Sequence, residues 1–266
     1  MSQRLKHTFN RLKTQNEKAL VGFVTAGDPN PAASMDILSA MCEAGLDILE
    51  LGIPFSDPTA DGPVIQRSSA RSLSHGTYID TVLDMTRQLR QTFEIPIVLF
   101  SYYNPILAYG ISNFHREALN AGADAVLVVD LPPEESVEMF PQDTEHHLPL
   151  IHLVAPTTPP ERMRRIAASA TGFLYLVSMT GVTGSTGLNL SNIQTQIESI
   201  QRSAHIPVCV GFGVSTPEDA ASVSAVADGV VIGSAFERLI EENLTHPDLP
   251  LLVADKVTEF KAVVKS

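Results

Sequence analysis

Short runs of consecutive apolar residues alternate along the chain with longer segments in which apolar residues recur every three or four positions. The first pattern is typical of strands buried on both faces, and the second of amphipathic helices. The predicted strands are residues 19–25, 48–52, 97–100, 125–129, 150–154, 173–177, 208–210 and 229–232. Strands that alternate with helices indicate an α/β protein with a parallel sheet.

Helical periodicity already precedes the first predicted strand, where Leu5, Phe9 and Leu12 are spaced by four and three residues. It predicts an extra helix at the N-terminus. Further helices are predicted at residues 31–43, 77–91, 113–120, 160–169, 192–202 and 217–225. Because no linker or low-complexity segment interrupts this alternation, we expect residues 1–266 to form a single domain.

The residues that lead into the predicted strands are of two repeating kinds. A proline leads into the third, fifth and seventh strands, and a stretch of small residues with an aspartate leads into the second, fourth and eighth. The prolines are Pro96, Pro149 and Pro207, and the aspartates are Asp47, Asp124 and Asp228. This alternation favours a single-domain (β/α)8 TIM barrel, whose interior is filled by alternate strands. An open doubly wound sheet is the alternative, although no Gly-x-Gly-x-x-Gly follows the first strand.

Composition narrows the class of protein further. Hydrophobic residues make up 44% of the 266 residues, and the formal charge of −12 comes without a cluster of lysine or arginine. We therefore expect no nucleic-acid binding. Two isolated cysteines, Cys42 and Cys209, indicate buried reduced thiols, and no apolar run reaches the roughly 18 residues of a membrane span. Together with a polar N-terminus, these features predict a cytoplasmic protein that does not act at a membrane.

Barrel active sites lie at the C-terminal ends of the strands, so the residues that follow each strand carry the candidate chemistry. The seventh strand is followed by Gly211, Phe212 and Gly213, and the eighth by Gly233 and Ser234. Glycines let backbone amides approach a ligand, and each turn leads into a helix whose N-terminus favours anions. These turns predict a phosphate site, with ordinary strand-to-helix turns as the alternative.

The segment after the sixth strand, residues 178–187, is rich in glycine and in hydroxyl side chains. Such a composition suits a mobile lid beside the phosphate site, and equally a disordered loop. We expect Asp130, which closes the fourth strand, either to orient that lid or to cap the following helix.

A carboxylate, Glu50, interrupts the apolar second strand, and Asp57 and Asp61 lie in the loop that follows. A charge buried in a strand is costly unless it is paired or its pKa shifts. The open alternatives for Glu50 are a structural ion pair, a solvent-facing position on an edge strand, and an acid–base role. In the acid–base role, burial raises the pKa of Glu50, whereas Asp61 on its polar loop stays ionised and stabilises positive charge.

The sequence lacks the residues that metal-dependent and Schiff-base chemistry would need. His146 and His147 are adjacent and cannot face one ion from a helix, so we expect no metal site. No lysine ends a predicted strand, which argues against Schiff-base chemistry. An apolar mouth remains beside the phosphate turns, formed by Phe23, Phe100, Leu127, Tyr175 and Phe212. The combination favours a lyase or isomerase that acts on an aromatic or apolar phosphate ester.

Several motifs carry a resemblance to a known family. The sequences LELGIPFSDP at residues 49–58 and ADGP at residues 60–63 resemble the signature of the tryptophan synthase alpha chain. Residues 23–29, 181–184 and 211–213 fit the same family in order and spacing. The resemblance covers essentially the whole chain.

The resemblance implies a TIM-barrel lyase that cleaves indole-3-glycerol phosphate to indole and glyceraldehyde 3-phosphate by a retro-aldol reaction, in the last stage of tryptophan biosynthesis. Glu50 would be the general acid and base, and Asp61 would stabilise charge at the indole N–H. The residues implied to hold the phosphate are Gly184, Gly213, Gly233 and Ser234, and those implied to surround the ring are Phe23, Tyr102, Leu127, Tyr175 and Phe212.

The resemblance also implies a partner, the tryptophan synthase beta chain, in an alpha–beta–beta–alpha heterotetramer. Pyridoxal phosphate would belong to that partner, and this chain would carry no cofactor of its own. The loop with Asp57 and the lid with Thr183 would close together and communicate with the beta chain. Thr59 departs from the family, which usually has an aliphatic residue there, and leaves the strength of this coupling open.

Two other functions stay open. An epimerase or isomerase acting on a sugar phosphate would need a metal site or a second acid–base residue on another strand, and the sequence offers neither. A subunit that only activates its partner would not need both Glu50 and Asp61, although activation and catalysis can coexist.

Overall fold

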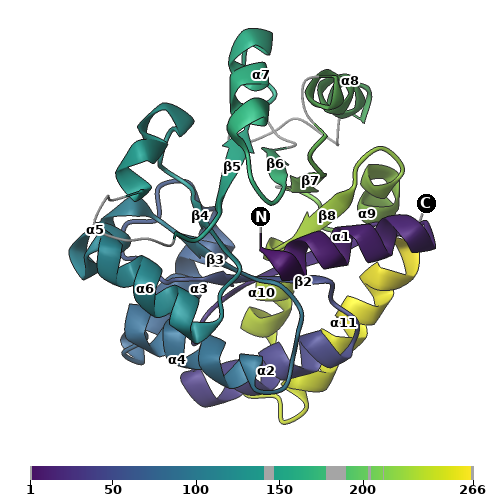
Figure 1. The fold of residues 1–266 in the computed structure, drawn as a ribbon. Coiled ribbons are helices and arrows are strands. Elements are labelled where there is room, and N and C mark those ends of the chain that lie inside the picture. Colours follow the sequence, from purple (N-terminus) through teal and green to yellow (C-terminus); the bar gives the residue numbers. More distant parts are fainter. Residues whose placement is uncertain (1, 141–146, 178–189, 203–204, 212, 265–266) are drawn as a thin grey trace.

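The computed structural model describes residues 2–140, 147–177, 190–202, 205–211 and 213–264 (Figure 1). Parallel strands pair in chain order and close into a barrel, because the last strand pairs with the first. The strands are β1 (Ala19–Thr25), β2 (Ile48–Gly52), β3 (Ile97–Ser101), β4 (Ala125–Val128), β5 (Leu150–Val154), β6 (Leu174–Val177), β7 (Val208–Gly211) and β8 (Gly229–Ile232). The predicted (β/α)8 TIM barrel is confirmed, and the doubly wound alternative is wrong.

Helices surround the barrel, as Figure 1 shows. They are α1 (Gln3–Gln15), α2 (Pro31–Glu43), α3 (Pro63–Ser74), α4 (Ile79–Arg90), α5 (Tyr103–Tyr109), α6 (Ile111–Ala121), the 3-10 helix η1 (Pro133–Met139), α7 (Pro160–Ser169), α8 (Leu190–Gln201), α9 (Pro217–Ser224), α10 (Ser234–Glu242) and α11 (Leu249–Val263). The predicted N-terminal helix is confirmed as α1. Its Phe9 ring lies 6.0 Å from that of Phe173, so α1 packs against the interior of the barrel.

One helix beside the site, α3, was not predicted from the hydrophobic pattern. Its buried face consists of Ser68, Ser69 and Ser72, which carry no apolar signal. A tightly packed helix with small polar residues on its buried face escapes a search for apolar periodicity. The missed helix matters because it begins directly after the loop that carries Asp61.

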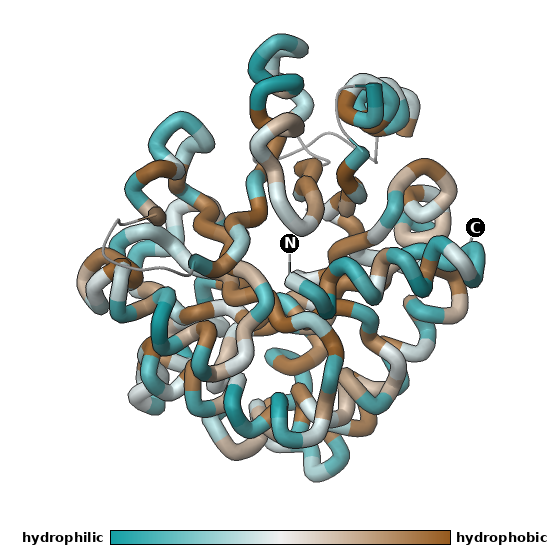
Figure 2. Tube along the Cα trace, viewed as in Figure 1, coloured by the Kyte–Doolittle hydropathy of each residue, from teal (hydrophilic) through white to brown (hydrophobic). Residues whose placement is uncertain are grey.

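The core has two layers. One fills the barrel interior and includes Phe23, Leu127 and Cys209, and the other lies between the strands and the surrounding helices and is larger. Figure 2 shows the hydrophobic strands at the centre and the mixed faces of the helices around them. Both cysteines are free and buried, as predicted. None of the described helices is long and apolar enough to cross a membrane.

The aspartates that lead into β2, β4 and β8 share one structural role. A carboxylate oxygen of Asp47 accepts the N–H of Leu20 at 2.9 Å, and that of Asp124 accepts the N–H of Ile97 at 3.0 Å. Asp228 does the same for β7, from Val208 at 2.9 Å. Each aspartate thus bonds an amide near the start of the preceding strand, which explains the repeat in the sequence.

Candidate active site

A cavity of about 260 Å³ opens at the C-terminal end of the barrel, as expected for this fold. It is lined by Phe23, Glu50, Asp61, Gly62, Pro63, Val64, Ile65, Phe100, Tyr175, Gly213, Val214, Val231, Gly233, Ser234 and Arg238. Carboxyl groups and glycines predicted from separate parts of the sequence therefore meet in one place, with apolar side chains between them.

Glu50 is the middle residue of β2 and is 1% exposed. Since β2 pairs with β1 and β3 inside a closed barrel, the solvent-facing edge-strand alternative is wrong. Neither carboxyl oxygen has a hydrogen-bond partner among the described residues, so the ion-pair alternative is not supported either. Burial raises the pKa of Glu50 to about 8, so the side chain is a neutral acid at pH 7.

Asp61 lies in the loop between β2 and α3 and turns into the cavity. Burial raises the pKa of Asp61 to about 6, and a hydrogen bond with Tyr102 only partly opposes this. The ionised form that the sequence predicts therefore predominates only above about pH 6. One cavity thus holds a neutral acid and a carboxylate at neutral pH, which is the arrangement that divided proton-transfer roles require.

The phosphate turn after β8 becomes the N-terminus of α10. The N–H groups of Phe236 and Glu237 bond the carbonyl of Gly233, while Gly233 itself provides no side-chain cap. A helix leaves its first amides unsatisfied, and these attract anions. Gly233 also allows close packing, because a Cβ atom there would lie 3.3 Å from Phe23. Gly213, on the facing turn, has a φ of 90°, which favours glycine.

Two of the residues implied to surround the ring lie outside the cavity lining. The hydroxyl of Tyr102 accepts the N–H of Ala60 at 2.9 Å and also bonds Asp61. Tyr102 therefore holds the loop in place without lining the cavity. Leu127 is fully buried in the barrel interior. Among the described residues, Phe23 and Tyr175 are the implied ring residues that reach the cavity.

Asp57 and Asp130 lie at the same end of the barrel but do not line the cavity. Asp57 is exposed and accepts a hydrogen bond from Ser56. Asp130 accepts the N–H of Tyr103 at 2.8 Å, which ties the end of β4 to the first turn of α5. The predicted cap on the following helix is therefore wrong, since no side chain caps η1.

Some predicted residues lie outside the part of the chain that the structure describes. They are Thr183, Gly184, Phe212 and the segment 178–187 that the sequence predicts as a lid or a disordered loop. Their predicted roles stay predictions. No group of histidine, cysteine, aspartate or glutamate suited to a metal ion occurs among the described residues.

Arg238 and the apolar residues Val64, Ile65 and Val231 line the cavity but were not predicted from the sequence. Arg238 follows Ser234 by four residues in α10 and therefore lies one helical turn away, at the exposed edge of the cavity. A sequence signal for the start of α10 at Ser234 would have been enough to place Arg238 one turn later, beside the cavity. The others required α3 and the barrel register, neither of which local periodicity supplies.

Comparison with known proteins gives a consistent result. A sequence model of the family described as tryptophan synthase alpha chain matches residues 9–264. Relatives named tryptophan synthase alpha chain include one from Desulfosudis oleivorans, 61% identical across 98% of this chain and 99% of its own length. Another, from Desulfatibacillum aliphaticivorans, is 57% identical across 98% of each chain.

Solved structures agree with the sequence relatives. Tryptophan synthase subunit alpha from Legionella pneumophila superposes with a TM-score of 0.89 at 39% identity, covering 99% of this chain and 98% of that one. A chain of Mycobacterium tuberculosis tryptophan synthase gives a TM-score of 0.88 at 33% identity and full coverage of both, 100% each.

Proposed function

This chain belongs to the tryptophan synthase alpha chain family, and we propose that it cleaves indole-3-glycerol phosphate to indole and glyceraldehyde 3-phosphate. The observation that carries the proposal is Glu50, a neutral acid that has no hydrogen-bond partner among the described residues and lines an apolar cavity opposite a helix N-terminus. Residues 1–266 would act as one catalytic domain. No cofactor of its own is required for the steps that follow.

The cavity suits the two ends of this substrate. Its phosphate would bind backbone amides at Gly213, Gly233 and Ser234, where the helix dipole of α10 favours an anion. The indole ring would lie among apolar side chains such as Phe23 and Phe100, whose rings are 5.1 Å apart. The glycerol carbons would then span the space between these two regions.

Glu50 would act first as an acid and then as a base. Its proton moves to C3 of the indole, and the positive charge that develops at the ring nitrogen is stabilised by ionised Asp61. The Glu50 carboxylate then removes the proton of the hydroxyl on the carbon bonded to C3. That oxygen forms the aldehyde C=O, the C–C bond breaks, and its electron pair restores the aromatic ring. Glu50 ends the cycle protonated, as it began.

A tryptophan synthase beta chain is the partner we propose, in an alpha–beta–beta–alpha assembly. Two exposed apolar residues support a docking surface at the same end of the barrel as the cavity, namely Leu107 on α5, which is 52% exposed, and Val137 on η1, which is 72% exposed. The loop with Asp57 and the segment with Thr183 would close toward this partner. Pyridoxal phosphate would be bound by the beta chain.

The test is direct. Purified chain is supplied with indole-3-glycerol phosphate, and indole release is followed with and without a beta chain. Glu50→Gln is the test variant, and Glu94→Gln is the control, because Glu94 is an exposed carboxylate with 80% of its side chain accessible. Wild-type-like turnover by Glu50→Gln would overturn the assignment of Glu50.

A second measurement, the activity of the beta chain with wild-type chain or with Glu50→Gln, separates catalysis from a purely activating role. If the chain only activates its partner, Glu50→Gln stimulates the beta chain normally and wild-type chain releases no indole under either condition. If both roles coexist, Glu50→Gln abolishes indole release but leaves the stimulation of the partner intact.

A further inference from the structure

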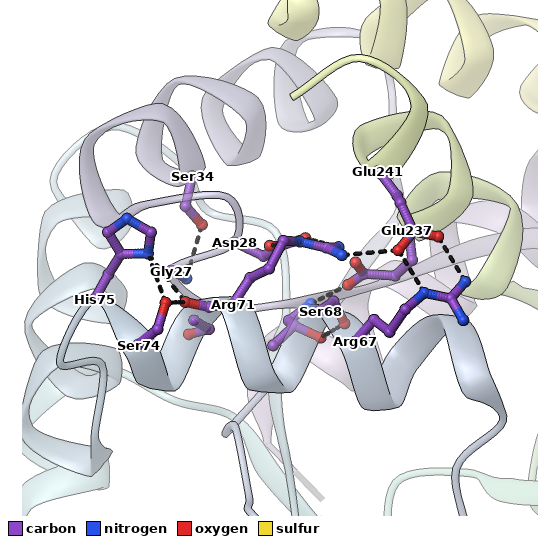
Figure 3. Close-up of polar contacts among 12 residues, drawn as sticks. Gly27, Asp28, Ser34, Arg67, Ser68, Arg71, Ser74, His75, Glu237 and Glu241 are labelled. Atoms are coloured by element: carbon purple, nitrogen blue, oxygen red, sulfur yellow. Dashed lines mark hydrogen bonds and ion pairs between the residues drawn. The ribbon is translucent and has the colours of Figure 1, made fainter. Parts of the chain in front are cut away.

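Glu237 is a carboxyl group in the first turn of α10 that the proposed mechanism does not use (Figure 3). Its side chain is 0% exposed. One oxygen, Oε1, accepts the backbone N–H of Thr25 at 2.5 Å, and the other has no hydrogen-bond partner among the described residues. A half-satisfied carboxyl group in the core is costly, so this position calls for an explanation.

The bond to Thr25 links α10 to two other elements around the cavity. Thr25 is the last residue of β1, the strand whose Phe23 lines the cavity. The hydroxyl of Thr25 lies 2.7 Å from that of Ser68 on α3, the helix that follows Asp61. Glu237 therefore fixes the helix with the phosphate amides against both the strand and the helix that frame the site.

The charges around Glu237 already balance without it. Arg71 on α3 binds Asp28 through two bonds of 2.8 and 2.9 Å and also reaches Glu241 at 2.8 Å. Arg67 binds Glu241 through two further bonds of 2.6 and 2.7 Å, and Figure 3 shows the whole cluster. Two guanidinium groups thus face two carboxylates, so among the described residues Arg71 offsets the charge of an ionised Glu237 only in part.

The neighbours of Glu237 act on its pKa in both directions, and those that raise it prevail. Burial, followed by the charge of Asp28, raises the pKa of Glu237 to about 8, while the Thr25 bond and Arg71 oppose this. From α11, the contact with this turn of α10 is apolar, with the ring of Phe260 5.7 Å from that of Phe236. At pH 7 Glu237 is therefore a neutral acid.

We propose that Glu237 is a positioning residue for the phosphate end of the cavity, holding the N-terminus of α10 in place as a neutral acid and weakening phosphate binding when it ionises. The inference rests on the proposed function for the identity of the phosphate ligand. Anions bind a helix N-terminus through its dipole and free amides, and a carboxylate in the same turn competes for both. With Glu237 neutral, Arg238 is the charged side chain of this turn and lies at the edge of the cavity.

The experiment measures binding of glycerol 3-phosphate by isothermal titration calorimetry at pH 7 and pH 9. This probe carries the phosphate without the indole, and it is already largely a dianion at pH 7 because its second pKa is about 6. All variants carry Glu50→Gln, so that Glu50 does not titrate in the same range. The two proteins compared are Glu50→Gln and Glu50→Gln/Glu237→Gln.

Glycerol 3-phosphate affinity of the Glu50→Gln protein should fall about tenfold between pH 7 and pH 9, the scale of one charge at the first turn of a helix. Addition of Glu237→Gln should abolish this fall and leave the affinity at pH 7 within about twofold, because glutamine keeps the oxygen that accepts from Thr25. Glu237→Ala should weaken binding at both pH values, because it removes the hydrogen bond to Thr25 that holds α10 in place.

A pH-independent affinity in the Glu50→Gln protein overturns the inference, and so does a tenfold fall that survives Glu237→Gln. Indole release by the wild-type chain is measured separately, so failure of the proposed cleavage leaves the binding result interpretable. Absence of any glycerol 3-phosphate binding at pH 7 overturns the inference about Glu237, whereas the proposed cleavage is judged by indole release alone. In the active enzyme, Glu237→Gln should lower KM at pH 9 relative to wild type.

Discussion

Asp124 and Glu50 lie at opposite ends of the barrel and are buried to nearly the same degree, but they differ in their partners. At the N-terminal end, Asp124 is 2% exposed, accepts the N–H of Ile97 and pairs with Arg90 at 3.0 Å. At the C-terminal end, Glu50 is 1% exposed and bonds to nothing in the described structure. The role of a buried carboxyl group is therefore decided by its hydrogen-bond and ion-pair partners, and not by burial alone.

The difference separates stability from chemistry along the barrel axis. Asp47 repeats the pattern of Asp124, with Arg11 at 2.8 Å and Lys261 at 2.5 Å. These groups connect strands to each other and to α1 and α11. Glu50 and Glu237, by contrast, stay neutral at pH 7 because burial raises their pKa values. Stability at the bottom face and function at the top face is the usual division in this fold.

The largest expected effect is the loss of activity in Glu50→Gln. Since no other group at the C-terminal end is proposed to carry both proton transfers, indole release should fall by about a thousandfold or more. Steady-state indole production measures it, with circular dichroism to confirm folding. A loss below tenfold would mean that the proton carrier is another residue.

The second effect is a gain of stability in the same variant. The folded-state pKa of Glu50 is raised from 4.5 to about 8, so its unfavourable contribution is absent below pH 4.5 and grows until about pH 8. Glu50→Gln should therefore be more stable by on the order of 3 kcal/mol at pH 7 and show no gain near pH 4. Urea unfolding at both pH values measures this. Equal gains at pH 4 and pH 7 would contradict it.

The corresponding substitution at the N-terminal end, Asp124→Asn, should lower the free energy of unfolding, whereas Glu50→Gln raises it. Asp124→Asn removes the ion pairs with Arg4 and Arg90 but keeps an oxygen for the N–H of Ile97. It should cost about 2 kcal/mol of unfolding free energy and leave the turnover of folded enzyme unchanged. Arg90 also bonds backbone carbonyls, which limits the loss. Reduced kcat in the folded variant would break the comparison between the two ends.

A smaller effect is expected from pH alone. The proposed mechanism needs ionised Asp61, with a pKa of about 6, and protonated Glu50, with a pKa of about 8. Turnover should be highest between these values and fall about tenfold per pH unit outside them. Asp61→Asn should remove the acidic limb and keep the alkaline one. An acidic limb that persists in this variant would assign it to another group.

The smallest effect is expected from Asp228→Asn. Asp228 accepts the N–H of Val208 as the other two aspartates do for their strands, but it is only partly buried. Asparagine keeps the acceptor oxygen, so the variant should lose about 0.5 kcal/mol of unfolding free energy. Chemical unfolding beside Asp124→Asn measures the ranking. A loss equal to that of Asp124→Asn would show that charge contributes equally at both positions.

Much of the barrel could be predicted because its signals are local. Strands buried on both faces need consecutive apolar residues, and bonds from Asp47, Asp124 and Asp228 to the preceding strand need an aspartate at one fixed position. Glu50 was visible for the same reason, since a carboxyl group stands out in an apolar run. Gly233 was visible as a glycine directly after the eighth strand, where a Cβ atom would contact Phe23 tightly at 3.3 Å.

What the sequence determined by itself was thus the barrel, the place of Glu50 in it and the glycine turns across its mouth. Only the tertiary structure decided that Tyr102 bonds Asp61 and that Arg238 reaches the cavity. It also decided that Glu237 bonds Thr25, a residue 212 positions away in the sequence. The physical reason is the distance along the sequence between the residues that interact. Local patterns report which face of an element is buried, whereas hydrogen bonds and raised pKa values depend on neighbours that distant segments bring together.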